Sequence, residues 1–210
     1  MVHIEIDYTV FPPGKSHKDV EIRELLKVSH SKKCCYCESA NIKGEVEHFR
    51  PKAHYPWLTD DYRNLLWACH GCNQHKAAQL PVERKMADAP DPVPVCDEKE
   101  TLSMLNPSYD DKAIQSFQFD QQGYMSSKSK TASKTIEICK LNRVDLLDKR
   151  KEVLFNFEKI IMSAQHFVDE EKRLDFLKEM LLSPALERKD SSFIAFRKYI
   201  IRNWLRQMLE

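Results

Sequence analysis

Two pairs of cysteines constrain this chain more than any other feature of its sequence. Cys34 and Cys37 form one C-x-x-C pair, and Cys69 and Cys72 form a second. Zn²⁺ prefers four tetrahedral ligands, and each C-x-x-C turn can place two thiolates on one ion. The sulfurs therefore predict a structural zinc site that is closed, with no coordination position left for chemistry. The alternatives are unrelated buried thiols or a redox motif, and neither pair lies in the βαβ context of a redox motif.

The segment between the two pairs is longer than in common zinc fingers, since 31 residues separate Cys37 from Cys69. Within it, EVEHFRP alternates like a short strand that ends at Pro51, and NLLWAC is a second strand candidate. CNQHKAA, which starts at the last cysteine, can begin a short helix. The sequence thus predicts two strands and a helix, held by zinc where so small a fold could not hold itself.

The rest of the chain is organised around this unit. Apolar residues recur at helical spacing from about Lys128 onwards, and also from Ser16 to about Ser29. The predicted fold class is α+β, with a small zinc-stapled core and a mostly α-helical C-terminal half. The predicted parts are an N-terminal arm and helix (1–30), the zinc-stapled core (31–80), a proline- and acid-rich connector with a hairpin turning at Gly123 (81–127), and a helical region (128–210).

Composition narrows the classes of function. The net charge is +1, so any contact with nucleic acid must come from local patches. No apolar run approaches the ~20 residues that a membrane span needs, and the N-terminus carries acids where a secretory signal has a basic flank. We therefore expect a cytoplasmic protein without a membrane partner. In that compartment Cys35, Cys96 and Cys139 are expected to be small buried hydrophobic residues.

Polar residues suited to catalysis lie in and just after the insert. Glu47 directly precedes His48, Asn64 follows in the insert, and Asn73 comes directly after the last cysteine. Carboxylate and amide oxygens suit Mg²⁺ or Mn²⁺, which keep several waters and bind phosphate oxygens. A histidine with a pKa near neutrality can take a proton from water. These residues predict a one-metal phosphodiester hydrolase, in which His48 activates water and the ion stabilises the leaving oxygen.

The same residues resemble the HNH endonucleases, which have the ββα-metal fold. The resemblance rests on the C-x-x-C pair, the acid–His pair with a proline three residues later, and NLLWAC-x-x-CN-x-x-K. It implies that His48 is the general base, that Glu47 and Asn73 hold the catalytic ion, and that Asn64 tethers the loop and orients the base. The acid is more often aspartate and the last position often histidine, so this is an H-N-N variant whose preferred ion stays open.

A narrower resemblance covers roughly residues 30 to 151. EHFRPK, YPWL, NLLWACHGCNQHK, LNPSYDD and TIEICKLNR-x-x-L-x-x-KR look like PtuB, the HNH nuclease subunit of Septu-type and retron-associated anti-phage systems. In that family the nuclease works with an ABC/SMC-like ATPase, PtuA, encoded beside it. The resemblance therefore implies two partners, DNA and a PtuA-like ATPase, in a defence complex that restrains or directs the nuclease.

Basic residues near the acid–His pair are candidate nucleic-acid contacts, because arginine and lysine match phosphate oxygens. They are Arg50, Lys52 and Lys76, while His75 could supply either a phosphate contact or a further metal ligand. A zinc-ribbon nucleic-acid-binding module, or a scaffold without catalysis, is the alternative interpretation. The intact acid–His–Asn–Asn set favours the nuclease, because a pure binding module has no reason to keep all four. The sequence leaves open double-stranded DNA, single-stranded DNA and RNA as targets.

Overall fold

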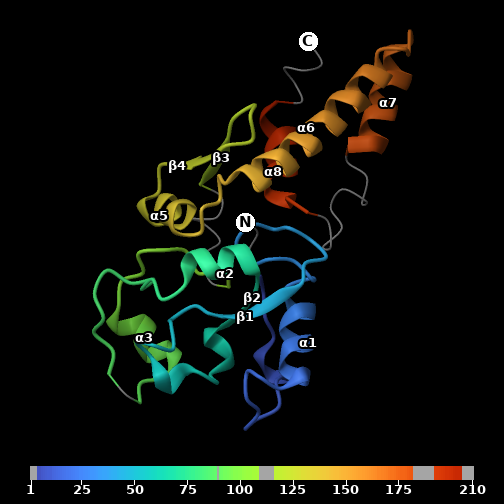
Figure 1. The fold of residues 1–210 in the computed structure, drawn as a ribbon. Helices are drawn as coiled ribbons and strands as arrows, with labels where there is room; N and C mark the ends of the chain where they lie inside the picture. Colours follow the sequence, from blue (N-terminus) through green and yellow to red (C-terminus); the bar gives the residue numbers. More distant parts are fainter. Residues whose placement is uncertain (1–3, 89, 109–115, 182–191, 205–210) are drawn as a thin grey trace.

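The computed structural model describes residues 4–88, 90–108, 116–181 and 192–204, which form a mixed α/β protein (Figure 1). Its strands make two separate antiparallel pairs, β1 with β2 and β3 with β4. The elements are, in chain order, α1 (Val20–Ser29), β1 (Gly44–His48), β2 (Leu65–Cys69), α2 (His70–Lys76), α3 (Val93–Lys99), β3 (Phe117–Phe119), β4 (Met125–Ser127), α5 (Lys130–Ile138), α6 (Val144–Ala164), α7 (Glu170–Leu181) and α8 (Ile194–Asn203). Short 3-10 turns lie at Tyr8–Val10, Pro56–Leu58 and Tyr62–Asn64.

The strands β1 and β2 and the helix α2 follow one another as the sequence predicts. The strands pair in a register that runs from Gly44 opposite Cys69 to His48 opposite Leu65. A Cβ atom added at Gly44 would lie 2.2 Å from the Trp67 ring, so only glycine fits at the start of β1. The helix α2 begins directly after β2, and Cys69 ends the strand and caps the helix.

The two faces of the β1–β2 pair lie against different parts of the chain. Because successive side chains of a strand point to opposite faces, Leu65 and Trp67 pack on one face, while Leu66 and Ala68 pack on the other. The first face meets α1 and the N-terminal arm through Phe11, Ile22 and Leu26. The second face joins the core formed with the C-terminal helices. In Figure 1 α1 and α2 accordingly lie on opposite sides of the strands.

The C-terminal helices complete the core of the cysteine-bearing unit. One cluster of buried side chains includes Cys34 and Cys72 together with Leu146, Phe157 and Phe196 from α6 and α8. The helix α6 packs against both α7 and α8. Within the described ranges, no helix is long and apolar enough to cross a membrane. The predicted boundaries between the parts stay predictions, but hydrophobic packing continues across them.

Two predicted elements differ in the structure. The connector contains a helix, α3, where the sequence predicts only a loop and a hairpin. Pro92 and Pro94 indicated a loop in the sequence. In the structure Pro92 is the N-cap of α3 and Pro94 lies in its first turn, where a missing N–H group costs no helical hydrogen bond. The first helix begins at Val20 and not at Ser16, since the Asp19 side chain accepts a hydrogen bond from Ser16 N and closes a turn there. The predicted hairpin at Gly123 is confirmed.

Candidate functional site

The four paired cysteines lie together, as predicted. Their Sγ atoms all lie within 4.8 Å of one another, and the Sγ atoms of Cys37 and Cys69 are 3.8 Å apart. Tetrahedral zinc with Zn–S bonds of about 2.3 Å places its sulfur ligands about 3.8 Å apart. The donor set and its spacing therefore fit a zinc ion. Cys35, Cys96 and Cys139 lie outside this group and are buried, which confirms the expectation for them.

Backbone hydrogen bonds bring the two cysteine pairs to one point. A bridge between Lys33 and Ala40 closes the first turn, inside which Cys34 N donates to Ser39 O. In the second pair, the Cys69 thiol caps α2 by accepting from Cys72 N at 3.5 Å. Burial raises the pKa of the Cys34 thiol. A bound cation is what allows four crowded, buried thiols to ionise together.

Arg143 extends from the start of α6 to the cysteine cluster. Its Nη1 lies 3.4 Å from Cys72 Sγ, and its Nη2 lies 3.8 Å from Cys69 Sγ. Nη1 also donates to the carbonyl of Cys139. Four thiolates around Zn²⁺ carry a net charge of about −2, and the guanidinium offsets part of that charge. The sequence contains no local signal for this contact, because 71 positions separate Arg143 from Cys72.

Substitution of Arg143 should weaken zinc binding without removing a ligand. We expect Arg143→Met to lower the zinc affinity about 10- to 100-fold, the usual effect of removing a partner of metal ligands. Competition with a chromophoric chelator measures this affinity. Lys149→Met, which removes an exposed cation from α6, is the control and should bind zinc like the parent. Equal zinc affinity in the two variants would show that Arg143 does not support the cluster.

The predicted acid and base lie on opposite faces of β1. The Glu45 and Glu47 side chains contact α2, whereas His48 contacts the loop after β1 and the N-terminal segment. This follows from the alternation of side chains along a strand. Among the described residues, no hydrogen bond joins the His48 ring to Glu47, Asn64 or Asn73. The site therefore has two sides, which meet at the C-terminal end of β1.

On the α2 side, Glu47 and Lys76 form a buried ion pair. Lys76 Nζ lies 2.6 Å from Glu47 Oε1 and donates to the carbonyl of His48 at 2.9 Å. Tyr36 also donates to Oε1, so both side-chain contacts of Glu47 fall on one oxygen. Burial raises the pKa of Glu47, and the Lys76 ammonium opposes that rise. Lys76 is fully buried. The structure thus gives Lys76 a different role from the predicted phosphate contact: it neutralises Glu47.

Removal of the Lys76 charge should destabilise the fold, because it leaves a buried carboxylate unpaired. We expect Lys76→Met to lower the free energy of unfolding by about 3–5 kcal/mol. Urea denaturation of the zinc-loaded protein measures this quantity. Lys99→Met is the matched control, since Lys99 pairs with Asp91 at the surface and such pairs contribute little to stability. A Lys76→Met variant as stable as Lys99→Met would contradict the assignment.

Asn73, the predicted second ligand of the catalytic ion, pairs with Glu45. Asn73 Nδ2 donates to Glu45 Oε2 at 2.8 Å, and the other carboxylate oxygen lies 2.8 Å from His70 Nδ1. The hydrogen bond from Asn73 lowers the pKa of Glu45 most, and the hydrogen bond with His70 has the next largest effect. Glu45, Glu47 and Asn73 thus place hard oxygen donors on facing sides of β1 and α2, which suits Mg²⁺ or Mn²⁺ chemically. His75 is partly exposed on α2, and its role stays a prediction.

On the opposite side, the loop after β1 holds the His48 ring. His48 Nε2 lies 2.9 Å from the carbonyl oxygen of Thr59. A carbonyl only accepts, so Nε2 carries the proton and Nδ1 carries the lone pair. Burial, together with charges on His17, Lys52 and Lys76, lowers the pKa of His48 to about 4, below the near-neutral value expected from the sequence. The ring is therefore neutral at neutral pH and can accept a proton on Nδ1.

Asn64 ties this loop to the end of β1. Its Oδ1 accepts from Arg50 N at 2.8 Å, and its Nδ2 donates to the carbonyls of Arg50 and Leu58 at 2.9 and 3.2 Å. Thr59, whose carbonyl holds His48, directly follows Leu58. Asn64 therefore acts on His48, the predicted base, indirectly through the backbone of the loop.

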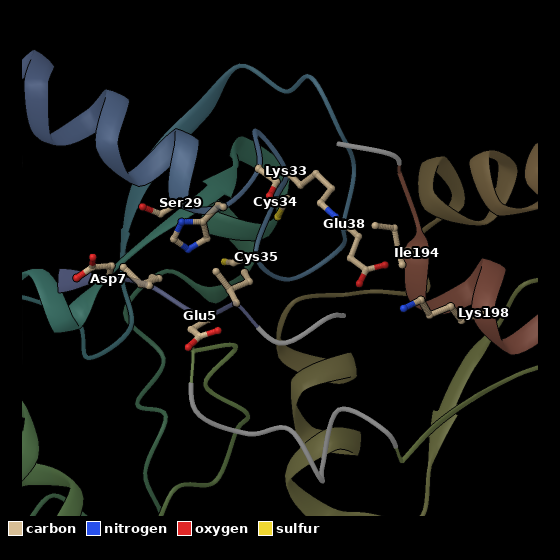
Figure 2. A pocket seen from close by; sticks show the side chains of 13 residues that line it. Glu5, Asp7, Ser29, Lys33, Cys34, Cys35, Glu38, Ile194 and Lys198 are labelled. Carbon is tan, nitrogen blue, oxygen red and sulfur yellow. The ribbon is translucent and has the colours of Figure 1, made fainter. Parts of the chain in front are cut away.

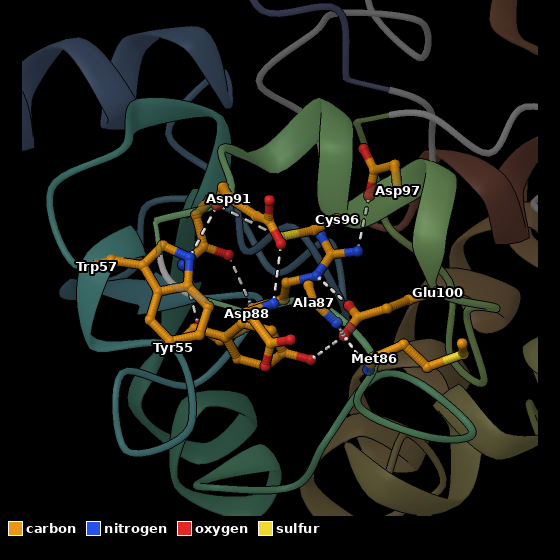
Figure 3. Close-up of polar contacts among 11 residues, drawn as sticks. Tyr55, Trp57, Met86, Ala87, Asp88, Asp91, Cys96, Asp97 and Glu100 are labelled. Atoms are coloured by element: carbon orange, nitrogen blue, oxygen red, sulfur yellow. Dashed lines mark hydrogen bonds and ion pairs between the residues drawn. The ribbon is translucent and has the colours of Figure 1, made fainter.

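Arg50 has a structural role that the sequence did not reveal. The side chain is fully buried, with Nη2 2.8 Å from Asp97 Oδ1 and Nε 3.0 Å from Glu100 Oε2. Glu100 also accepts from Tyr55 and from two backbone N–H groups, so these contacts join α3 to the loop after β1 (Figure 3). An enclosed, paired guanidinium is not available to phosphate, which corrects its prediction as a phosphate contact. Lys52 is exposed and remains a candidate.

A cavity of about 830 Å³ borders the cysteine cluster and not the His48 ring (Figure 2). It lies between the N-terminal arm, the first cysteine turn and α8. Its lining includes Cys34 and Cys35 and charged residues of both signs, among them Glu5, Lys33 and Lys198. None of the predicted catalytic residues lines it, so the predicted nuclease chemistry does not use this cavity.

Comparisons with known proteins relate the chain to one bacterial system. It is 33% identical over 165 residues to the Septu protein PtuB of Bacillus mycoides, covering 70% of this chain and 55% of that protein. It is 30% identical over 154 residues to the Septu protein PtuB of Bacillus thuringiensis, covering 68% and 51%. A Septu protein PtuA of Bacillus mycoides is 25% identical over 200 residues, covering 88% of this chain and 27% of that protein. The chain thus spans about half the length of its PtuB relatives. No family model and no solved structure matches.

Proposed function

Because the chain resembles the PtuB proteins of Septu systems, we propose that it is a metal-dependent HNH endonuclease that hydrolyses phosphodiester bonds of DNA. The observation that carries the proposal is the position of His48. Its Nε2 donates to the Thr59 carbonyl, which leaves Nδ1 for a proton from water, and the acid before it in β1 faces α2. Such a ring is prepared to take a proton from water.

The base acts through Nδ1 of His48. This nitrogen removes a proton from a water molecule, the resulting hydroxide attacks phosphorus, and the bond from phosphorus to the leaving oxygen breaks. Asn64 keeps the loop closed over the end of β1, so that the Thr59 carbonyl continues to orient the ring. A bound phosphodiester adds a negative charge near His48, which raises the pKa of the ring and makes it a stronger base.

Glu47 and Asn73 are the residues that would hold the catalytic ion, with Glu45 beside them. A Mg²⁺ or Mn²⁺ ion bound there supplies positive charge that stabilises the leaving oxygen. Lys76 pairs with one oxygen of the Glu47 carboxylate. The amide nitrogen of Asn73 donates to Glu45, so Oδ1 of Asn73 is not used in that contact. The cysteine cluster would have a separate, structural role, because one zinc ion would use all four of its sulfurs.

We further propose that the nuclease is the effector of a cytoplasmic anti-phage defence complex. The similarity to Septu proteins PtuB and PtuA supports this assignment, and a PtuA-like ATPase is the proposed partner. An unrestrained nuclease would harm its own cell, so we expect low activity until the partner or an infection signal changes the complex.

The proposal is tested by plasmid cleavage with Mg²⁺ or Mn²⁺, with and without the PtuA-like partner. We expect metal-dependent cutting that stops when EDTA is added. An activator or an RNA target would be examined if no mixture cut DNA. Failure of those as well, with zinc bound and the fold intact, would favour a nucleic-acid-binding module without catalysis.

Substitution of Asn73 tests the proposed ion ligands. We expect Asn73→Ala to raise the Mn²⁺ concentration needed for half-maximal cutting by about tenfold or more, because the ion loses an oxygen ligand. Gln74→Ala, an exposed neighbour on α2, is the control and should leave the Mn²⁺ requirement unchanged. Identical metal titrations for the two variants would contradict the role of Asn73.

A further inference from the structure

The N-terminal segment is fastened to the loop that holds His48. The Tyr62 hydroxyl donates to the Pro12 carbonyl and lies 3.0 Å from the Lys15 carbonyl, and its oxygen accepts from Lys15 N. Asp60 holds the residues that follow: its Oδ1 accepts from Ser16 Oγ at 3.1 Å and from His17 N at 2.8 Å. A segment from the start of the chain thereby becomes part of the wall around the predicted base.

This docking places a second histidine ring beside His48. The two ring centroids are 4.9 Å apart, and the ring planes meet at 78°. His17 Nδ1 lies 2.6 Å from Asp60 Oδ1, and only 12% of the His17 side chain is exposed. The neighbouring residue Thr59 holds His48. Two consecutive residues of one loop therefore orient both rings, Thr59 through its carbonyl and Asp60 through its carboxylate.

Each ring keeps one nitrogen free for a ligand. A carboxylate, like a carbonyl, only accepts, so His17 donates through Nδ1 and His48 donates through Nε2. Among the described residues, neither Nε2 of His17 nor Nδ1 of His48 has a hydrogen-bond partner. If the two rings only packed against each other, neither ring would need a hydrogen bond to fix its orientation. Each ring is fixed by a hydrogen bond at one nitrogen and has the other nitrogen without a partner. This arrangement suits the binding of a ligand next to the two rings.

The charges around the rings favour an anion. Lys52 is an exposed cation whose charge acts on His48, whereas the charge of Lys76 is paired with Glu47. Lys18, which follows His17 in the chain, is exposed. Asp60 is the acid in direct contact with His17, and its Oδ1 is already used by the Ser16–His17 turn. The ammonium groups of Lys18 and Lys52 suit a phosphate group and disfavour a cation.

We propose that His17 is a phosphate-binding residue of the nuclease site. Asp60 accepts from Nδ1 of His17. Nε2 of His17 donates to a non-bridging oxygen of the phosphodiester, which is attacked by the water that His48 activates. Both hydrogen bonds form when the ring carries a proton on each nitrogen. The proposal rests on the proposed nuclease function and adds a residue that lies outside β1, β2 and α2. Nothing in the segment KSHK pointed to this role before the fold brought it to the loop.

Two substitutions separate phosphate binding from a purely structural role. The amide of His17→Gln can place a donor near the position of Nε2 but cannot keep the bond to Asp60. The amide of His17→Asn can keep the donor near Nδ1 but has nothing at Nε2. We expect His17→Asn to lose about 10- to 100-fold in the rate of single-turnover cleavage, the effect of one hydrogen bond to a charged group. His17→Gln should stay within about tenfold of the parent.

Binding provides a second measurement that does not depend on cutting. A fluorescent duplex titrated in Ca²⁺, which replaces the catalytic ion, should bind His17→Asn more weakly than His17→Gln. His54→Ala, an exposed histidine of the same loop region, is the control and should match the parent in both assays. Zinc content and circular dichroism establish that each variant is folded.

The outcomes are distinguishable. Weaker binding and slower cutting in His17→Asn than in His17→Gln support the proposal. The reverse order overturns the proposal, because then only the contact of His17 with Asp60 matters. Equal behaviour of both variants and the parent also overturns it, because then neither contact matters. If the parent binds the duplex but never cuts it, the proposed function fails while the order of the two affinities still decides the role of His17. A parent that neither binds nor cuts DNA overturns both.

Discussion

Replacing His48 by alanine should abolish DNA cleavage while leaving the fold and the zinc content unchanged. General-base catalysis contributes about 10²- to 10⁴-fold to a rate, so we expect a loss in that range. The structure explains why so little else should change. The ring is partly exposed at the last position of β1, and among the described residues its one hydrogen-bond partner is the Thr59 carbonyl. Loss of one hydrogen bond costs about 0.5–1.5 kcal/mol in stability.

The experiment compares parent and variant at saturating metal. Plasmid nicking gives the rate, and zinc analysis with thermal unfolding gives the state of the fold. His54→Ala removes an exposed histidine from the same region and should cut like the parent. A His48→Ala protein that keeps its zinc and cuts as fast as the parent would show that another group is the base.

Replacing Cys69 by serine should remove the zinc ion and unfold the unit that it holds. Structural zinc contributes on the order of 10 kcal/mol of apparent binding free energy in small domains, which is also folding free energy. Cys69 has two local roles, because it belongs to the four-sulfur group and its thiol caps α2. Serine is itself a good N-cap, so the substitution keeps the cap and reports the loss of the metal ligand.

Zinc content, circular dichroism and limited proteolysis measure this effect. Cys139→Ala is the control, since Cys139 is a buried thiol that lies outside the four-sulfur group. We expect that variant to bind one zinc ion per chain and to resist protease like the parent. A Cys69→Ser protein with full zinc content and unchanged unfolding would mean that the cluster is not a zinc site.

The sequence alone determined the features that depend on local spacing. The two C-x-x-C pairs indicated the four-cysteine group, because two residues between ligands form a turn that can present both sulfurs to one ion. Alternation in EVEHFRP predicted β1, and the helical periods after Lys128 predicted the C-terminal helices. The resemblance to PtuB was also readable from the motifs, and similarity to two PtuB proteins supports it.

Only the tertiary structure decided which charges are free and which residues surround the base. Arg50 and Lys76 resemble surface cations in the sequence, but α3 and Glu47 enclose them in buried ion pairs. His17 and Arg143 carry no local signal, yet the fold brings one to His48 and the other to the cysteine cluster. The physical reason is that the charge state and the accessibility of a side chain depend on all the groups packed around it. Those groups come from segments far apart in the chain, whose contacts no local pattern encodes.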